Sequence, residues 1–167
     1  HSASMETIKI HWNAVLSSPG ARYCTADISN MYLESKLESP QYVRFRWDLI
    51  PPRIRAAYNL EELKHQGFVY ARINRAWYGL KESGRIAHDD LVEHLAKIGY
   101  HKGKTEGLFL HKEKDLIFCL VVDDFACRYS NKQDALDLIT HIEKKYKFKV
   151  DWEARQYICL LYTSDAA

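Results

Sequence analysis

The sequence predicts an α+β fold in which helices pack on one face of a largely antiparallel sheet. Several segments carry apolar residues at helical spacing, and between the last two of them lie consecutive strand-like segments joined by short polar turns. The length of 167 residues, with 47% hydrophobic and 28% charged residues, is typical of one globular domain or of one piece of a larger one.

The first predicted elements are a helix and a strand. Residues 4–16 place four apolar side chains at helical spacing, and the SSPG sequence that follows ends the helix. In residues 22–28 small apolar side chains alternate with polar ones, which predicts a strand with one buried face. Asp27 falls at the end of this strand, on the opposite face.

Two helices and a strand are predicted in the middle of the chain. The proline pair at 51–52 is placed to open a helix that Gly67 closes, and residues 68–73 form a strand. Ser83 is expected to cap a second helix, whose apolar stripe ends at Gly99.

The C-terminal half predicts a run of hairpin strands followed by a helix. Residues 107–111 and 116–122 are joined by the polar sequence KEKD, and residues 125–129 continue the sheet after two aspartates. Asn131 then caps an amphipathic helix, and residues 148–150 form a short strand.

The composition limits the function classes. The longest apolar run, Leu116–Val122, is far too short to span a bilayer and the N-terminus lacks a signal pattern, so no membrane partner and an intracellular location are expected. The cysteines show no CxxC or Cys/His pairing, so neither a zinc site nor a disulfide framework is indicated. They are interpreted as buried small residues: Cys24, Cys119, Cys127 and Cys159.

A basic segment stands out against the mild net charge of +2. Such a segment is either a solvated surface or a contact surface for a phosphate backbone, and both interpretations stay open. Its cations are Arg44, Arg46, Arg53, Arg55, Lys64, Arg72 and Arg75.

Asp123 and Asp124 interrupt an apolar run, where two carboxylates would be costly unless a cation neutralised them. An Asp-Asp pair is also ordinary turn chemistry between two strands. If the strand that carries Asp27 pairs next to the hairpin, three carboxylates meet at one edge of the sheet. Hard divalent cations prefer such oxygen ligands, and a pair of Mg²⁺ ions about 3.5–4 Å apart supports phosphoryl transfer.

Three segments carry candidate functional motifs: VVDDF at 121–125, TADISNMYL at 25–33 and WYGLKESGRIAHDDL at 77–91. VVDDF resembles the catalytic acidic pair of reverse transcriptases, and TADISNMYL resembles their first catalytic motif, with an aromatic residue five positions after the aspartate. WYGLKESGRIAHDDL is similar to the YGL-containing segment before a helix in the reverse transcriptases of copia-type retrotransposons. The motifs follow the family order over nearly the whole chain.

The resemblance implies an RNA-directed DNA polymerase with a polymerase palm-like sheet. Asp27, Asp123 and Asp124 would be catalytic and would bind Mg²⁺ or Mn²⁺, and Tyr32 would pack under the sugar of the incoming nucleotide. Gly79 and Arg85 would also lie in the nucleotide-binding region. One of four lysines would protonate the leaving pyrophosphate: Lys144, Lys145, Lys147 or Lys149.

The chain departs from the family at Glu82, where glutamine is usual. A carboxylate there is expected to weaken binding of a triphosphate. The nucleotide-binding set implied by the resemblance is therefore Tyr32, Gly79, Glu82 and Arg85.

The resemblance also predicts the domain organisation. Residues 1–158 would be a partial reverse transcriptase domain, with the palm and its motifs A to D but without the start of the fingers and the thumb. Residues 159–167 would be a non-native tail that resembles a translated sequencing adaptor. The fragment alone is expected to be inactive or nearly so, because template and triphosphate would be poorly held.

The implied partners are an RNA or DNA template-primer, a deoxynucleoside triphosphate and the remainder of a retrotransposon polyprotein. The implied location is a cytoplasmic virus-like particle, the nucleus, or both. Three alternatives remain: a noncatalytic RNA-binding module, a degenerate polymerase domain, and a different two-metal enzyme that hydrolyses or transfers phosphoryl groups.

Overall fold

The α+β class is confirmed in the computed structural model, which describes residues 2–157 and 160–161. Its centre is a six-stranded sheet in the order β4-β5-β6-β7-β1-β8, and every neighbouring pair in it is antiparallel. The strands are β1 (Arg22–Ser29), β4 (Tyr100–Lys102), β5 (Leu108–His111), β6 (Leu116–Val121), β7 (Asp124–Tyr129) and β8 (Lys147–Asp151).

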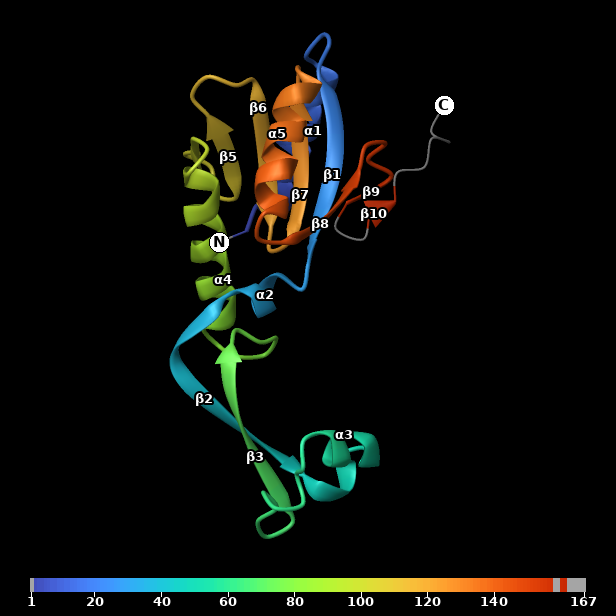
Figure 1. Ribbon diagram of the computed structural model, residues 1–167. Helices are drawn as coiled ribbons and strands as arrows, with labels where there is room; N and C mark the ends of the chain where they lie inside the picture. Colours follow the sequence, from blue (N-terminus) through green and yellow to red (C-terminus); the bar gives the residue numbers. More distant parts are fainter. Residues whose placement is uncertain (1, 158–159, 162–167) are drawn as a thin grey trace.

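Helices cover both faces of this sheet (Figure 1). α4 (Ser83–Ala96) and α5 (Lys132–Glu143) pack on one face, over a core rich in phenylalanine and leucine side chains. α1 (Met5–Leu16) covers part of the opposite face, where Ile8 packs with Ala126. α4 and α5 lie on one face as expected, whereas α1 departs from the expected single covered face and explains why residues on both faces of β1 are buried.

The expected helix caps were correct at α5 and wrong at α4. The Asn131 side chain accepts a hydrogen bond from the Gln133 N–H at the start of α5. Glu82, and not Ser83, is the N-cap of α4, and its side chain makes no capping hydrogen bond. The Ser83 hydroxyl is buried and instead accepts a hydrogen bond from the Trp77 N–H, 2.9 Å away. A hydrogen bond from the preceding loop thus uses the oxygen that a helix cap would have used.

A long two-stranded arm extends from the sheet (Figure 1). After the short helix α2 (Met31–Glu34), β2 (Lys36–Arg46) pairs with β3 (Phe68–Arg75), and a 3-10 turn and α3 (Pro52–Ala57) lie between them. We call residues 36–75 the arm.

The helix predicted to run to Gly67 ends at Ala57. Asn59 adopts the left-handed conformation with φ 48°, and the N–H groups of Asn59 and Leu60 return to the carbonyls of Ala56 and Arg55. This is a Schellman ending, in which asparagine is tolerated at the left-handed position. The local cap outweighed the apolar spacing that continues to Leu63, whose side chain is exposed.

The end of the described chain forms two short strands, β9 (Gln156–Tyr157) and β10 (Leu160–Leu161). Cys24, Cys119 and Cys127 are buried and free, as expected, whereas Cys159 and most of the predicted non-native tail lie outside the described residues. Within those residues, no helix is both long and apolar enough to cross a membrane.

Candidate functional site

The strand register brings two of the predicted aspartates face to face. β1 lies between β7 and β8, and Asp27 pairs with Asp124 on one side and with Lys149 on the other. Directly opposed residues of antiparallel strands project from the same face, so the three side chains form a row across the sheet. The pairing that the sequence left conditional is therefore present.

Asp123 lies in the two-residue turn between β6 and β7. The Ile28 N–H of β1 donates a 3.0 Å hydrogen bond to the Asp123 carbonyl, and the Ser2 hydroxyl accepts one from the Val122 N–H. The turn is thus fastened to the strand that carries Asp27.

Val122, the first residue of this turn, is strained. Its φ is 57°, a left-handed value that a β-branched residue rarely adopts, and its side chain is 41% exposed. Hairpin turns of this length normally place glycine or asparagine at such a position. Strain of this kind persists where the surrounding structure holds it, frequently at functional sites.

Replacing Val122 with glycine is expected to raise the free energy of unfolding by about 1 kcal/mol, because relief of strain exceeds the extra entropy that glycine gives the unfolded chain. Urea unfolding measures this. Val121→Gly is the matched control, since Val121 lies in β6 and the same change there should destabilise the protein. A loss of stability in both variants would contradict the assignment of strain to Val122.

The carboxylates repel one another. Burial, together with the negative charges of Asp123 and Asp27, raises the pKa of Asp124 to about 6. Burial also raises the pKa of Asp123, with a smaller contribution from the charge of Asp27. A cation bound among these carboxylates would therefore relieve their repulsion and favour their charged forms.

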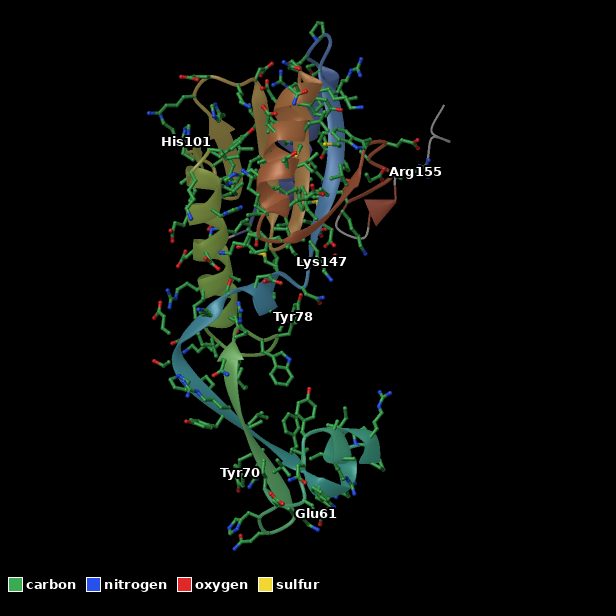
Figure 2. The ribbon with its side chains drawn as sticks, in the orientation of Figure 1. Glu61, Tyr70, Tyr78, His101, Lys147 and Arg155 are labelled. Carbon is green, nitrogen blue, oxygen red and sulfur yellow. The ribbon has the colours of Figure 1, made fainter. Side chains whose placement is uncertain are left out.

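Two tyrosines lie beside the carboxylates. The rings of Tyr32 and Tyr78 meet edge to face, with centroids 4.5 Å apart. Burial raises the pKa of Tyr78, and the negative charges of Asp123 and Asp27 add to this effect. Figure 2 shows Tyr78 where the arm joins the sheet. Gly84 on α4 lies against Tyr32: a Cβ atom at this position would be 3.7 Å from the Tyr32 hydroxyl oxygen, an ordinary van der Waals distance.

The remaining predicted residues lie on the segment that leads into α4. Gly79 has φ 94°, which requires glycine, and Glu82 is exposed at the N-cap. Arg85 pairs with Asp89 at 3.4 Å and with Glu38 at 3.9 Å. Arg85 is thus engaged in a separate charged cleft of about 460 Å³, and its contact with a nucleotide stays a prediction.

The carboxylates of Asp27, Asp123 and Asp124 are suitable ligands for a hard divalent cation, but they are not close enough together to form a complete metal site. Within the described part of the chain, no three His, Cys, Asp or Glu side chains form a group that could hold a metal ion. Carboxylate oxygens are nevertheless the ligands that Mg²⁺ prefers, and the register supplies two of them on one face. Side-chain movement would be needed to bring Asp123 onto the same ion.

Sequence reasoning missed two features of the site. Tyr78 lies within the YGL-containing segment without a predicted role of its own, yet its ring contacts that of Tyr32 and the negative charges of Asp123 and Asp27 help to raise its pKa. Among the four lysines, Lys145 is held by Asp90 at 2.5 Å, whereas Lys149 lies opposite Asp27. The sequence left the choice among the four lysines open, because only the strand order sets Lys149 beside Asp27.

Comparison with known proteins shows a likeness of fold. No family model matches the chain. Among solved structures, the chain is similar to telomerase from Candida albicans in complex with a TWJ fragment of telomeric RNA, with a TM-score of 0.50 and 12% sequence identity. The match covers 93% of this chain and 31% of that one, so the chain spans about a third of the telomerase that it matches. At this identity the likeness concerns the fold alone.

Proposed function

We propose that the chain is the palm part of an RNA-directed DNA polymerase of the copia type, which transfers nucleotides to a primer. The observation that carries this proposal is the pairing of Asp27 with Asp124 across adjacent strands, with Asp123 in a turn fastened to the same strand. The likeness of fold to telomerase, a reverse-transcriptase-related polymerase, supports it.

Asp27, Asp123 and Asp124 would hold Mg²⁺ or Mn²⁺. When bound, these ions would activate the primer 3′-hydroxyl for attack on the α-phosphate of a deoxynucleotide and would neutralise the leaving pyrophosphate. Lys149 is the best placed of the four lysines to give a proton to that pyrophosphate, because its neighbour in the register is Asp27.

Tyr32 would support the sugar of the incoming nucleotide, held in place by the Tyr78 ring. A rigid aromatic face there would exclude a ribose 2′-hydroxyl by steric clash. Gly79, Glu82 and Arg85 would border the same nucleotide, and Glu82 would weaken its binding by charge repulsion. The substrates in this proposal are a template-primer and a deoxynucleoside triphosphate, within a larger polyprotein.

Cation binding tests the carboxylate assignment without any need for turnover. A cation present at about ten times its dissociation constant stabilises the folded state by about 1.4 kcal/mol, which raises the melting temperature by about 3–5 °C for a chain of this size. We expect Mg²⁺ or Mn²⁺ to produce such a rise in the wild type and little or none in Asp124→Asn.

The matched control is Asp137→Asn, which changes an exposed aspartate on α5 that pairs with Lys114. Its response to the cation should equal that of the wild type. An equal response in Asp124→Asn would show that the cation binds elsewhere.

A noncatalytic RNA-binding module is the second candidate, because the arm carries exposed aromatic side chains such as Tyr42 and Tyr70. In that case RNA binding would be the whole function: Mg²⁺-dependent primer extension would be absent, and Asp123→Asn would have no functional effect.

A further inference from the structure

One face of the arm alternates arginine with aromatic side chains. The register of β2 and β3 pairs Tyr42 with Arg72, Arg44 with Tyr70, and Arg46 with Phe68. Opposed residues, and residues two apart along a strand, project from the same side of a ribbon. The six side chains therefore share one surface, which we call the Arg/aromatic face: Tyr42, Arg44, Arg46, Phe68, Tyr70 and Arg72.

The rings of this face are open to solvent. Tyr42 is 69% exposed and Tyr70 is 55% exposed, and Figure 2 shows Tyr70 on the arm, away from the six-stranded sheet. The Arg44 guanidinium lies over the Phe68 ring, 4.8 Å from its centroid. The side chains that alternate with them on the ribbon, such as Val43 and Ala71, are smaller, apolar and less exposed.

Two arginines of this face are available to a ligand. Arg44 and Arg72 have no carboxylate within ion-pair distance among the described residues, whereas Arg46 binds Asp48 at 2.6 Å. Other cations of the arm are used internally. Arg55 donates to the Ile50 and Trp47 carbonyls, and Arg75 donates to the Glu34 carbonyl.

The charge of the arm indicates the class of ligand. Residues 36–75 contain eight lysine or arginine residues and four aspartate or glutamate residues, a net charge of +4, while the whole chain carries only +2. The remainder of the chain is therefore slightly acidic. The Arg/aromatic face itself contains no carboxylate and no aliphatic side chain, so its complement is an anion with flat apolar surfaces.

We propose that the Arg/aromatic face binds single-stranded nucleic acid. Phosphates would lie against Arg44 and Arg72, and bases would stack on Tyr42 and Tyr70. Base–aromatic stacking tolerates any sequence, and basic side chains beside the rings follow the backbone. This contact uses neither the aspartates nor a divalent cation, so it holds whether or not the chain is a polymerase.

The first test measures the fluorescence anisotropy of a labelled single-stranded oligouridylate or oligothymidylate bound to the 167-residue chain in EDTA at low salt. Tyr42→Ala and Tyr70→Ala should each weaken binding about tenfold, within the range that stacking of one base provides. The Tyr70→Phe variant keeps the ring and should bind like the wild type.

Tyr58→Ala is the matched control. Tyr58 is 70% exposed, close to the value for Tyr42, but lies at the end of α3 and outside the Arg/aromatic face. Its loss should leave affinity unchanged. Equal weakening by Tyr58→Ala, or no weakening by the other two alanine variants, would overturn the proposal.

The second test separates phosphate contacts from stacking. Each phosphate contact with a single strand contributes about 0.7 to the slope of log affinity against log salt. The double variant R44Q/R72Q should lower that slope by about 1.4, whereas the tyrosine variants should leave it unchanged. Arg22→Gln, at the far end of β1 and exposed, is the control and should not alter the slope.

Two further outcomes are decisive. Polyglutamate that competes as well as the oligonucleotide would show a general polyanion surface, or a docking site for an acidic protein, and would overturn the proposal. Asp123→Asn should bind the oligonucleotide as the wild type does. If primer extension fails while oligonucleotide binding persists, only the polymerase proposal is contradicted. If primer extension occurs but the variants of the Arg/aromatic face do not weaken oligonucleotide binding, only the proposal for this face is contradicted.

Discussion

Asp123→Asn is expected to lower Mg²⁺-dependent primer extension by at least about a thousandfold, which corresponds to about 4 kcal/mol of lost transition-state stabilisation. Asparagine has nearly the same shape as aspartate, and the backbone bond from the Ile28 N–H to the Asp123 carbonyl does not involve the side chain. The turn should therefore keep its structure. What is lost is one negative oxygen ligand beside Asp27 and Asp124.

The assay uses a longer chain that adds the fingers and thumb segments expected of a complete polymerase, with an RNA template and a DNA primer. Asp137→Asn serves as the control, because Asp137 lies on α5 and outside the site formed by Asp27, Asp123 and Asp124. This variant should extend the primer at the wild-type rate. Wild-type extension by Asp123→Asn would exclude the aspartate from catalysis, whereas equal loss in both variants would indicate a general folding defect.

Acidification is expected to destabilise the protein through His11. This residue of α1 is 5% exposed and its Nε2 lies 3.3 Å from the Ile117 carbonyl of β6. Burial, with a smaller contribution from the positive charge of Arg128, lowers the pKa of His11 to about 4, although the hydrogen bond to the Ile117 carbonyl acts in the opposite direction. Within the described residues, the second ring nitrogen has no hydrogen-bond partner.

The direction of this pH dependence follows from the pKa of His11 in the unfolded chain, about 6.5, and in the folded chain, about 4. Above pH 6.5 His11 is neutral in both states and costs no stability. As the pH falls from about 6.5 to about 4, the unfolded chain binds a proton that the folded chain does not, so stability is lost. The loss should reach about 2 kcal/mol between pH 7 and pH 5 and about 3 kcal/mol at lower pH.

Urea unfolding of the wild type and of His11→Asn at each pH measures this loss as a difference between the two proteins. The difference matters because the pKa of Asp124 is raised to about 6. Protonation of Asp124 as the pH falls therefore stabilises the folded state, which opposes the effect of His11. His101→Asn, which changes an exposed histidine of β4, should keep the wild-type pH dependence. An unchanged pH dependence in His11→Asn would contradict the assignment to His11.

The carboxylate site, formed by Asp27, Asp123 and Asp124, and the Arg/aromatic face lie on different parts of the molecule. The first is built into the buried six-stranded sheet, where register and the fastened turn hold its backbone. The second lies on a ribbon with little covering on this face. Rigid support suits chemistry that depends on position, and an open ribbon suits a ligand of variable sequence.

The local sequence pattern was enough to predict elements that have one buried face or a local helix cap. The apolar stripe of α5 and the Asn131 cap were correct, and so was the hairpin of β6 and β7, because periodicity and turn chemistry act over a few residues. β2 was missed because most of its residues are exposed on both faces, so its sequence lacks the alternation of a strand with one buried face, and Pro40 stands within it. The helix expected to run to Gly67 failed because Asn59 ended it earlier.

The sequence by itself determined the α+β class, the hairpin that carries Asp123 and Asp124, and the face of β1 on which Asp27 lies. Only the tertiary structure decided that β1 inserts between β7 and β8, which sets Asp27 against Asp124 and Lys149. It also decided that tyrosines and arginines more than twenty residues apart share one face of the arm. Strand order depends on contacts between segments that are distant in the sequence. The residue pattern within one strand does not identify which strand pairs with it.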